Sequence, residues 1–199
     1  MNTKSSPVIL WDVMSTLVYD PIHQEIPDFF GLSLQELYDT KHPTAWVDFE
    51  HGTIDEARFY ELYFPDNPDP IDGAVLREIL FDAYRFLEGI DALLDELHRK
   101  EVEMHALSNY PSWFEIIEEK LTLSRYLQWT FVSCKTGLRK PDPQAYLNAA
   151  STLNLDPRRC LFIDDRQKNC AAAERIEMDT ILFEDTPSLR AELSQRGIL

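Results

Sequence analysis

The run VILW at residues 8–11 is the feature that most constrains the fold of this chain, because Asp12 follows it directly. Four consecutive apolar residues are typical of a strand that is buried on both faces of a parallel sheet. A carboxylate immediately after such a strand lies at the carboxyl edge of the sheet, where open α/β folds bind their ligands. Asp12 could act there as a nucleophile oriented by Ser15 and Thr16, or it could simply form the turn that ends the strand.

Strands and helices alternate along the second half of the chain. We predict strands at residues 102–107, 129–134, 160–163 and 180–183, and helices at 89–100, 111–121, 169–175 and 188–195, with another helix beginning near Pro143. This alternation is typical of β-α-β units. It predicts the α/β class, with a Rossmann-like parallel sheet core that has helices on both faces.

A different pattern occupies the stretch between the first and second strands. Residues 18–31, VYDPIHQEIPDFFG, are punctuated by prolines and a glycine and are predicted to be a linker. Ser33 is followed three residues later by Glu36, which indicates a capping box at the start of a helix. The spacing predicts another helix over 72–84, and FPDNPDP at 64–70 is predicted to be a loop.

These patterns predict two parts. We expect residues 1–19 and 86–199 to form the sheet core, and residues 20–85 to form a small inserted α-helical cap.

The composition limits the possible partners. The chain has 19 Lys+Arg against 35 Asp+Glu, a formal net charge of −16. Such acidity opposes binding to DNA, RNA or anionic membranes, but a few local cations or a metal can still hold a small phosphorylated metabolite.

No apolar run approaches the length of a membrane span, and the leader MNTKSSP is too short for a signal or transit peptide. We therefore expect a cytoplasmic monomer or homodimer with no nucleic-acid or membrane partner.

Polar residues follow the predicted strands at their carboxyl ends. In chain order they are Asp12, Ser108 with Asn109, Lys140, and Asp164 with Asp165. Because parallel strands end at one edge of the sheet, these groups can converge. Each group alone is common in turns and loops. Their shared position after the predicted strands nevertheless favours a functional site.

The chemistry of these groups is mutually consistent with phosphoryl transfer. Ser108 and Asn109 can donate hydrogen bonds to phosphoryl oxygens, and Lys140 supplies a cation. Asp164 and Asp165 cannot both stay ionised close to Asp12 without a counter-charge. Mg²⁺ would satisfy them, because it takes oxygen ligands that often include one or two carboxylates and substrate phosphate. Metal and lysine would together stabilise charge on the transferring phosphoryl group.

Four segments carry a resemblance to a known family. WDVMSTL, LSNYP, GLRKPDPQAY and FIDDRQKNCAAAERIEM resemble, in order, the four motifs of haloacid-dehalogenase-superfamily hydrolases, and the insertion resembles their small helical cap. DVMST, KHPTAWVDFEHG, SNYPSWFEIIEEKL and RKPDP are more closely similar to the flavin mononucleotide hydrolases of plant plastids. The resemblance implies a Mg²⁺-dependent phosphatase that hydrolyses a small phosphomonoester, with flavin mononucleotide as the specific expectation.

The resemblance also implies individual roles. Asp12 would be the nucleophile and a Mg²⁺ ligand, and Lys140 would hold both nucleophile and phosphate. Ser108 and Asn109 would bind the phosphoryl group. Asp165 would bind the metal directly, Asp164 directly or through water, and Asn169 would orient the site.

One position departs from the family pattern. Phosphatases of this superfamily usually carry a second Asp, as general acid and base, two residues after the nucleophile, and here that residue is Met14. The backbone carbonyl of Met14 could still bind Mg²⁺, but its side chain cannot move a proton. Asp20 or His23 could replace the missing acid, with Asp20 preferred, although an Asp-Pro pair is more often a simple turn. Water could also protonate the leaving group, or catalysis could be lost.

Two further questions stay open in the sequence. Trp46, Phe49, Tyr60 and Tyr63 could stack on a flat ring of the substrate, or they could simply form the core of the insertion.

Two other functions also remain as alternatives. One is a metal-independent haloacid dehalogenase, in which the aspartate attacks carbon, and the other is a catalytically inactive binding protein that keeps the pocket.

Overall fold

The computed structural model describes residues 7–65 and 70–199, and its centre is a five-stranded sheet. The strands are β1 Val8–Trp11, β2 Met104–Ser108, β3 Gln128–Val132, β4 Cys160–Asp164 and β5 Asp179–Leu182. They pair in parallel in the order β3-β2-β1-β4-β5. The chain first builds one side of β1 and then crosses to build the other, so the strand order reverses beside β1, where open α/β sheets bind ligands.

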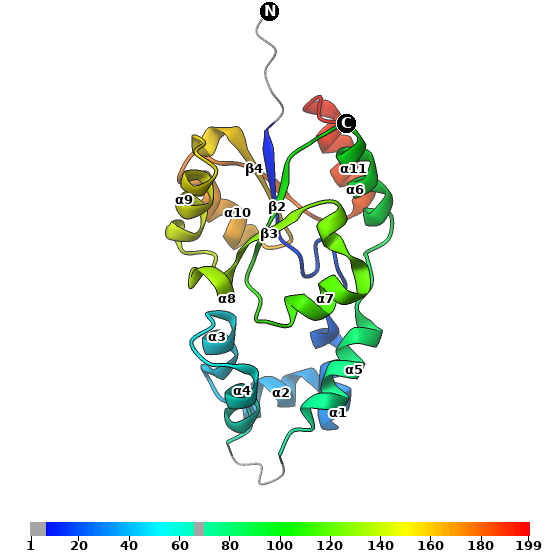
Figure 1. The fold of residues 1–199 in the computed structure, drawn as a ribbon, viewed down its shortest axis with the longest axis vertical. Helices are drawn as coiled ribbons and strands as arrows, with labels where there is room; N and C mark the ends of the chain where they lie inside the picture. Colours follow the sequence, from blue (N-terminus) through cyan, green and yellow to red (C-terminus); the bar gives the residue numbers. More distant parts are fainter. Residues whose placement is uncertain (1–6, 66–69) are drawn as a thin grey trace, which may run out of the picture.

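The two faces of the sheet bury alternate side chains. Ile9 and Trp11 belong to one apolar cluster and Leu10 to another, as the two-residue period of a strand requires. The first cluster contains side chains of α6 Ile90–Arg99, α7 Phe114–Leu121 and α11 Thr186–Gln195, and the second contains side chains of α9 Pro143–Thr152 and α10 Gln167–Glu174. Figure 1 shows α9 and α10 on one side of the sheet and α6 and α11 on the other. The predicted Rossmann-like core with helices on both faces is therefore confirmed.

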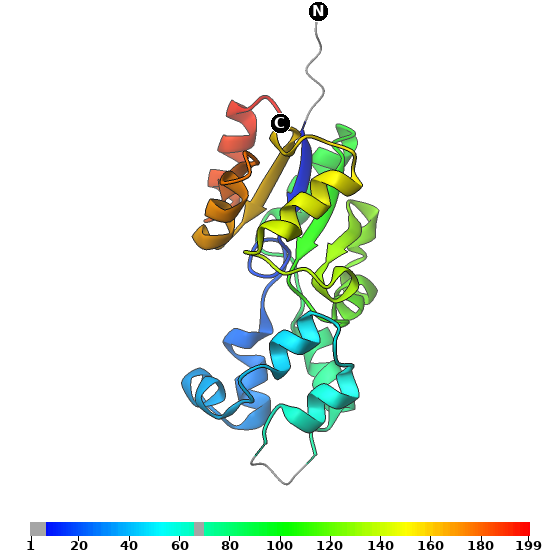
Figure 2. The same ribbon diagram turned by 90° about the vertical axis from the view of Figure 1, so that its left-hand side faces the viewer.

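A second group of helices lies beyond one end of the sheet. These helices are α1 Glu25–Phe30, α2 Leu34–Thr40, α3 Ala45–Glu50, α4 Glu56–Leu62 and α5 Gly73–Ala83. Figures 1 and 2 both show them at the end of the molecule opposite the N-terminus. The predicted capping box is present, since the Ser33 and Glu36 side chains each accept a hydrogen bond from the backbone N–H of the other residue. The division of the chain into a core and a cap at residues 19/20 and 85/86 stays a prediction.

The predicted linker over residues 18–31 is partly wrong, because it contains helix α1. Pro27 lies in the first turn of α1, where a backbone N–H has no partner within the helix, so proline is tolerated there. Gly31 ends the helix in the left-handed conformation, at φ 65°, and its N–H bonds to the carbonyl of Asp28. The residues that suggested a linker thus flank a short helix instead.

Other boundaries differ by a few residues. The strand predicted at 129–134 ends at Val132, because Ser133 and Cys134 begin the short helix α8 Ser133–Thr136, which was not predicted. The helix predicted from residue 111 begins at Phe114. Of the loop predicted at 64–70, residues 66–69 lie outside the described residues, as do residues 1–6 of the predicted leader. Within the described part of the chain, no helix is long and apolar enough to cross a membrane.

The end of α3 packs tightly against the start of α8. The Ser133 hydroxyl donates to the Glu50 carbonyl at 2.5 Å. Gly52 follows at φ 70°, and a Cβ built there would lie 2.4 Å from the Cys134 carbonyl oxygen. Glycine is therefore required at this contact for two reasons, the positive φ and the missing side chain.

We predict that Gly52→Ala destabilises the protein more than Gly31→Ala. Both glycines have positive φ, but nothing lies within 4 Å of a Cβ built at Gly31. Gly31→Ala should therefore lower the free energy of unfolding by about 1–2 kcal/mol, the cost of a left-handed residue with a Cβ. Gly52→Ala should cost at least about 1 kcal/mol more, because overpacking adds to that cost. Urea unfolding of the two variants tests this difference, and equal losses would contradict the close approach.

Candidate active site

A buried lysine joins two buried aspartates at the switch point of the sheet. Lys140 Nζ donates to Asp12 Oδ1 at 2.6 Å and to Asp164 Oδ2 at 2.7 Å. The side chains of Lys140 and Asp164 are 1 % and 0 % exposed. Thr16 Oγ1 donates to the other oxygen of Asp12 at 3.1 Å, which is the orienting role expected for this hydroxyl. Both oxygens of the Asp12 carboxylate are therefore held in place.

The topology explains why these residues meet. Asp12 follows β1 and Asp164 ends β4, and these two strands are hydrogen-bonded neighbours. Lys140 reaches them from the loop between α8 and α9. The Asn109 side chain holds this loop, because its Nδ2 donates to the Lys140 carbonyl and its Oδ1 accepts from the Lys140 N–H, both at 2.8 Å. The second motif thereby positions the lysine of the third.

Burial perturbs the proton affinity of these groups. It raises the pKa of the Asp12 carboxyl to about 7; Lys140 opposes this rise and the charge of Asp164 adds to it. Burial alone would lower the pKa of Lys140, but Asp12 and Asp164 together raise it above the usual value. The pKa of Asp165 is also raised, first by burial and then by the charge of Asp164. Lys140 thus opposes the protonation of Asp12 and Asp165 that burial favours.

Three carboxylates could hold a metal. Asp12, Asp164 and Asp165 each offer an oxygen within 4.8 Å of the others. This all-oxygen donor set fits Mg²⁺. Asp164 is the least available of the three, because its oxygens already accept bonds from Lys140, from Asn169 Nδ2 at 2.9 Å and from the Arg166 N–H at 2.8 Å. Half-buried Asp165 is better placed to bind a metal directly.

The two candidate phosphate ligands after β2 have different surroundings. Ser108 Oγ is buried, and in the described part of the chain it has no hydrogen-bond partner. Asn109 lines the cavity beside Asp12, but its side-chain amide is occupied by the backbone of Lys140. Asn169, expected to orient the site, bonds to Asp164 through Nδ2, and its buried Oδ1 has no partner among the residues described.

A cavity of about 300 Å³ opens beside these groups. It is lined from the strand ends and from the helical group by Asp12, Met14, Asp20, Ile22, Ile26, Tyr38, Lys41, Trp46, Glu50, Tyr63, Asn109, Tyr110, Arg139, Lys140, Pro141, Asp165, Arg166, Lys168 and Asn169. The lining thus brings together nearly all the predicted site residues. Ser108 and Asp164 are not among the described residues that line it.

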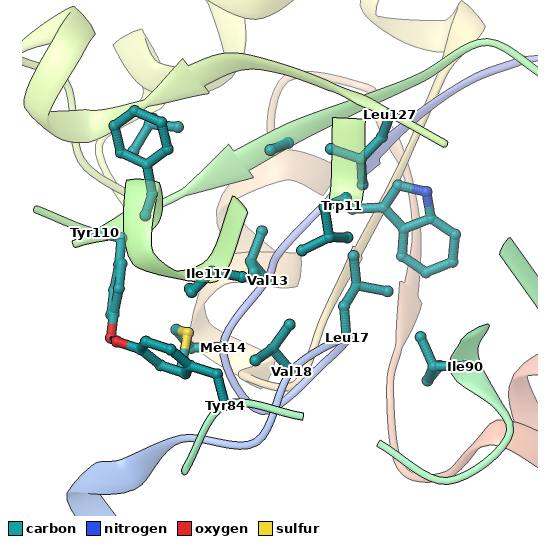
Figure 3. Packing of buried hydrophobic residues seen from close by; sticks show 14 of the residues in the cluster. Trp11, Val13, Met14, Leu17, Val18, Tyr84, Ile90, Tyr110, Ile117 and Leu127 are labelled. Atoms are coloured by element: carbon teal, nitrogen blue, oxygen red, sulfur yellow. The ribbon is translucent and has the colours of Figure 1, made fainter. Parts of the chain in front are cut away.

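Met14 is both a cavity residue and a core residue. It is 9 % exposed and belongs to the same apolar cluster as Tyr84 and Tyr110. Those two tyrosine hydroxyls lie 2.6 Å apart, and Figure 3 shows them meeting near Met14. The thioether carries no exchangeable proton, so the position usually held by the acid is apolar here.

The two residues proposed as substrate or acid contacts both reach the cavity. Asp20 caps the 3₁₀ helix Pro21–His23 by accepting from the Ile22 N–H at 3.0 Å, so the simple turn role is present as well. Burial raises the pKa of Asp20. Among the aromatic candidates, Trp46 and Tyr63 line the cavity. Phe49 is 2 % exposed and stacks on Phe59 in the apolar core.

Sequence reasoning missed five charged residues in the described cavity wall, which are Lys41, Glu50, Arg139, Arg166 and Lys168. Glu50 lies at the end of α3 and forms an ion pair with Arg139, which directly precedes Lys140. Glu50 Oε1 also accepts a hydrogen bond from Trp46 Nε1 at 2.8 Å. The i, i+4 spacing of Trp46 and Glu50 was the available signal, but nothing in the sequence joins Glu50 to Arg139.

Comparisons with known proteins show the family of this chain. Residues 7–177 match the haloacid dehalogenase-like hydrolase family. The chain is 45 % identical to the chloroplastic flavin mononucleotide hydrolase 1 of Arabidopsis thaliana, over 96 % of this chain and 78 % of that protein. A sesquiterpene phosphatase of Aspergillus oryzae is 25 % identical, over 82 % of this chain and 85 % of that protein. The chain therefore belongs to the haloacid dehalogenase-like hydrolases.

Solved structures share the fold. An enzyme of this family from Bacteroides thetaiotaomicron, in complex with magnesium and inorganic phosphate, has a TM-score of 0.77 at 18 % identity. The match covers 93 % of this chain and 99 % of that one. A dehalogenase has a TM-score of 0.62 at 16 % identity, over 89 % of this chain and 84 % of that one. At these identities the likeness concerns the fold.

We predict that Lys140→Met destabilises the protein by about 3–5 kcal/mol near pH 8, because two buried carboxylates lose their cation. The loss should be smaller at pH 5. When a carboxyl has a higher pKa in the folded than in the unfolded protein, the folded protein loses stability as the pH rises from the lower of these values toward the higher. Removing Lys140 strengthens this effect for Asp12. Urea unfolding in EDTA at the two pH values tests this. Lys168→Met, at an exposed lysine in the cavity wall, is the control, and a pH-independent loss would contradict the explanation.

Proposed function

We propose that the protein is a Mg²⁺-dependent phosphatase that hydrolyses a small phosphomonoester, with flavin mononucleotide as its substrate and riboflavin as the product. The observation that carries this proposal is the Lys140 ammonium held between Asp12 and Asp164. The similarity to the Arabidopsis flavin mononucleotide hydrolase supports the choice of substrate.

The reaction begins with attack of an Asp12 carboxylate oxygen on phosphorus. A bond forms between that oxygen and phosphorus, while the bond from phosphorus to the substrate's ester oxygen breaks and its electron pair leaves with the alcohol. Water then cleaves the aspartyl phosphate, releasing phosphate and restoring Asp12. Lys140 stabilises the negative charge of both nucleophile and phosphoryl group, and the Ser108 hydroxyl donates to a phosphoryl oxygen. Asn109 donates the second hydrogen of its Nδ2, because the first is bonded to the Lys140 carbonyl.

Asp12 and Asp165 would hold the metal, together with Asp164 directly or through water and the Met14 backbone carbonyl. Their close carboxylate oxygens support this assignment. A bound Mg²⁺ would neutralise and orient the phosphate. Helices α1–α5 would act as the cap that excludes water from the site and sets substrate choice.

Asp20 would protonate the leaving alcohol in place of the missing second aspartate. Of the carboxylates in the described cavity wall, Asp12 and Asp165 have other roles. Both oxygens of Glu50 already face donors, from Trp46 and Arg139. Asp20 accepts a backbone hydrogen bond at Oδ1, and burial raises its pKa, which favours the protonated form that an acid needs.

Two alternative functions make different predictions. In a dehalogenase the aspartate attacks carbon, and such enzymes need no metal. The three clustered carboxylates favour the phosphatase, because a metal compensates their charge. A non-catalytic binding protein is the other alternative, and Met14 is the feature that favours it. The cytoplasmic location and the monomeric or homodimeric state stay predictions from the sequence.

The first test is phosphate release from a panel of phosphorylated metabolites that includes flavin mononucleotide, with Mg²⁺ and with EDTA. We expect release only with the metal, and a loss of at least about 10³-fold for Asp12→Asn, which removes the nucleophile. Chloride release from a haloacid without metal would instead identify a dehalogenase. Binding of Mg²⁺ without turnover of any substrate would indicate a non-catalytic protein.

The second test separates proton donation from capping at Asp20. Asp20→Asn should slow hydrolysis of flavin mononucleotide, whose leaving group is a poorly acidic alcohol, by about 10²–10⁴-fold. It should change hydrolysis of p-nitrophenyl phosphate by less than about tenfold, because that leaving group needs no proton. Asp156→Asn is a matched control, since Asp156 also caps a 3₁₀ helix that starts with proline, by accepting from the Arg158 N–H at 3.0 Å. Equal losses with both substrates would exclude Asp20 as the acid.

A further inference from the structure

Glu50 is a buried carboxylate in the wall of the cavity. It is 5 % exposed, and burial raises its pKa, although Arg139 opposes this rise. Its backbone carbonyl accepts the Ser133 hydroxyl, and Gly52 two residues later packs against Cys134. Because the backbone on this side of the cavity is fixed to the core, the Glu50 carboxylate occupies a defined position.

Arg139 brings the opposite charge to the same part of the wall. Its side chain is 26 % exposed and pairs with Glu50, whose other oxygen accepts from the Trp46 indole. The pair therefore has no net charge, while the guanidinium keeps further N–H donors for uncharged acceptors. Trp46 adds an aromatic surface beside it.

A charged leaving group would interact with this wall differently from an uncharged one. In the proposed reaction the phosphoryl group binds at Asp12 and Lys140, so the rest of the substrate occupies the remainder of a cavity of about 300 Å³, whose wall includes Glu50. A leaving group with a second negative charge would meet a buried carboxylate whose arginine is already paired. Of the other cations in the described wall, Arg166 and Lys168 are exposed, so solvent screens their attraction. Lys41 is partly buried, and its ammonium lies 5.8 Å from the centre of the Tyr38 ring.

We propose that Glu50 is a specificity-determining residue that selects substrates with an uncharged leaving group. It does so by neutralising the Arg139 guanidinium, which would otherwise bind a second anion. A flat, uncharged ring with hydrogen-bond acceptors fits the pair and the Trp46 indole. This inference rests on the proposed phosphatase function and adds the chemical class of the leaving group.

The test compares two substrates that differ by one charge. Phenyl phosphate has an uncharged ring, whereas carboxyphenyl phosphate, used as its para and meta isomers, adds a carboxylate. We expect wild-type protein to prefer phenyl phosphate in kcat/KM. Glu50→Gln should reduce that preference by about tenfold or more, since two charges several ångströms apart in a partly buried site interact strongly. The change should lie mainly in KM, because it concerns binding of the leaving group.

A second glutamate that contacts both an indole and a guanidinium supplies a matched control. Glu56 accepts from Trp113 Nε1 at 2.5 Å and pairs with Arg77 at 3.0 Å, so it too joins an indole and a guanidinium. It is not among the residues that line the cavity in the described structure. Glu56→Gln should therefore leave the substrate preference unchanged, even if it lowers stability.

Several outcomes decide the inference. An unchanged preference in folded Glu50→Gln, or an equal change in Glu56→Gln, would overturn it. If Glu50→Gln does not fold, the double variant Glu50→Gln/Arg139→Gln removes both charges of the pair and should keep the wild-type preference, and a changed preference there would overturn the inference. If wild-type protein releases no phosphate from these compounds or from flavin mononucleotide with Mg²⁺, the phosphatase proposal fails. The ratio of dissociation constants for the two compounds, measured by calorimetry with Mg²⁺, then applies the same test to Glu50.

Discussion

The contact of the Lys140 ammonium with Asp12 and Asp164 is the interaction on which the rest of the site depends. Two carboxylates that are shielded from water repel each other and resist ionisation unless a cation lies between them. Lys140 provides this cation at hydrogen-bond distance from both. The contacts of Lys140 with Asp12 and Asp164 form only when β1, β4 and the loop before α9 are all in place. The site therefore assembles as the protein folds.

The surrounding residues act on this contact at different distances. Thr16 and Asn169 orient the two aspartates, and Asn109 fixes the backbone of the lysine. Arg139, the residue before Lys140, is paired with Glu50 of the helical group. A single loop therefore carries one cation to the two buried aspartates and another to Glu50 in the cavity wall. This adjacency offers a physical link between the position of the helical group and the arrangement of the charged residues at the sheet.

Much of the fold could be predicted because its signals are local. Apolar runs that end in an acidic residue identified β1 and β4, and a parallel topology allowed Asp12 and Asp164 to converge, as the pairing of these two strands then shows. Helix α1 was missed because Pro27 and Gly31 are compatible with either a linker or the two ends of a short helix. The Glu50–Arg139 pair was missed because it depends on how the helical group packs against the core, and no local spacing encodes that contact.

Detection of the covalent intermediate tests the central claim most directly. Protein quenched with acid during turnover of flavin mononucleotide can be reduced with borohydride, which converts an aspartyl phosphate into homoserine, and the modified peptide can be identified by mass spectrometry. The account predicts homoserine at position 12 and at no other aspartate, and none without substrate. Full phosphate release with an unmodified Asp12, or modification of a different carboxylate, would contradict it.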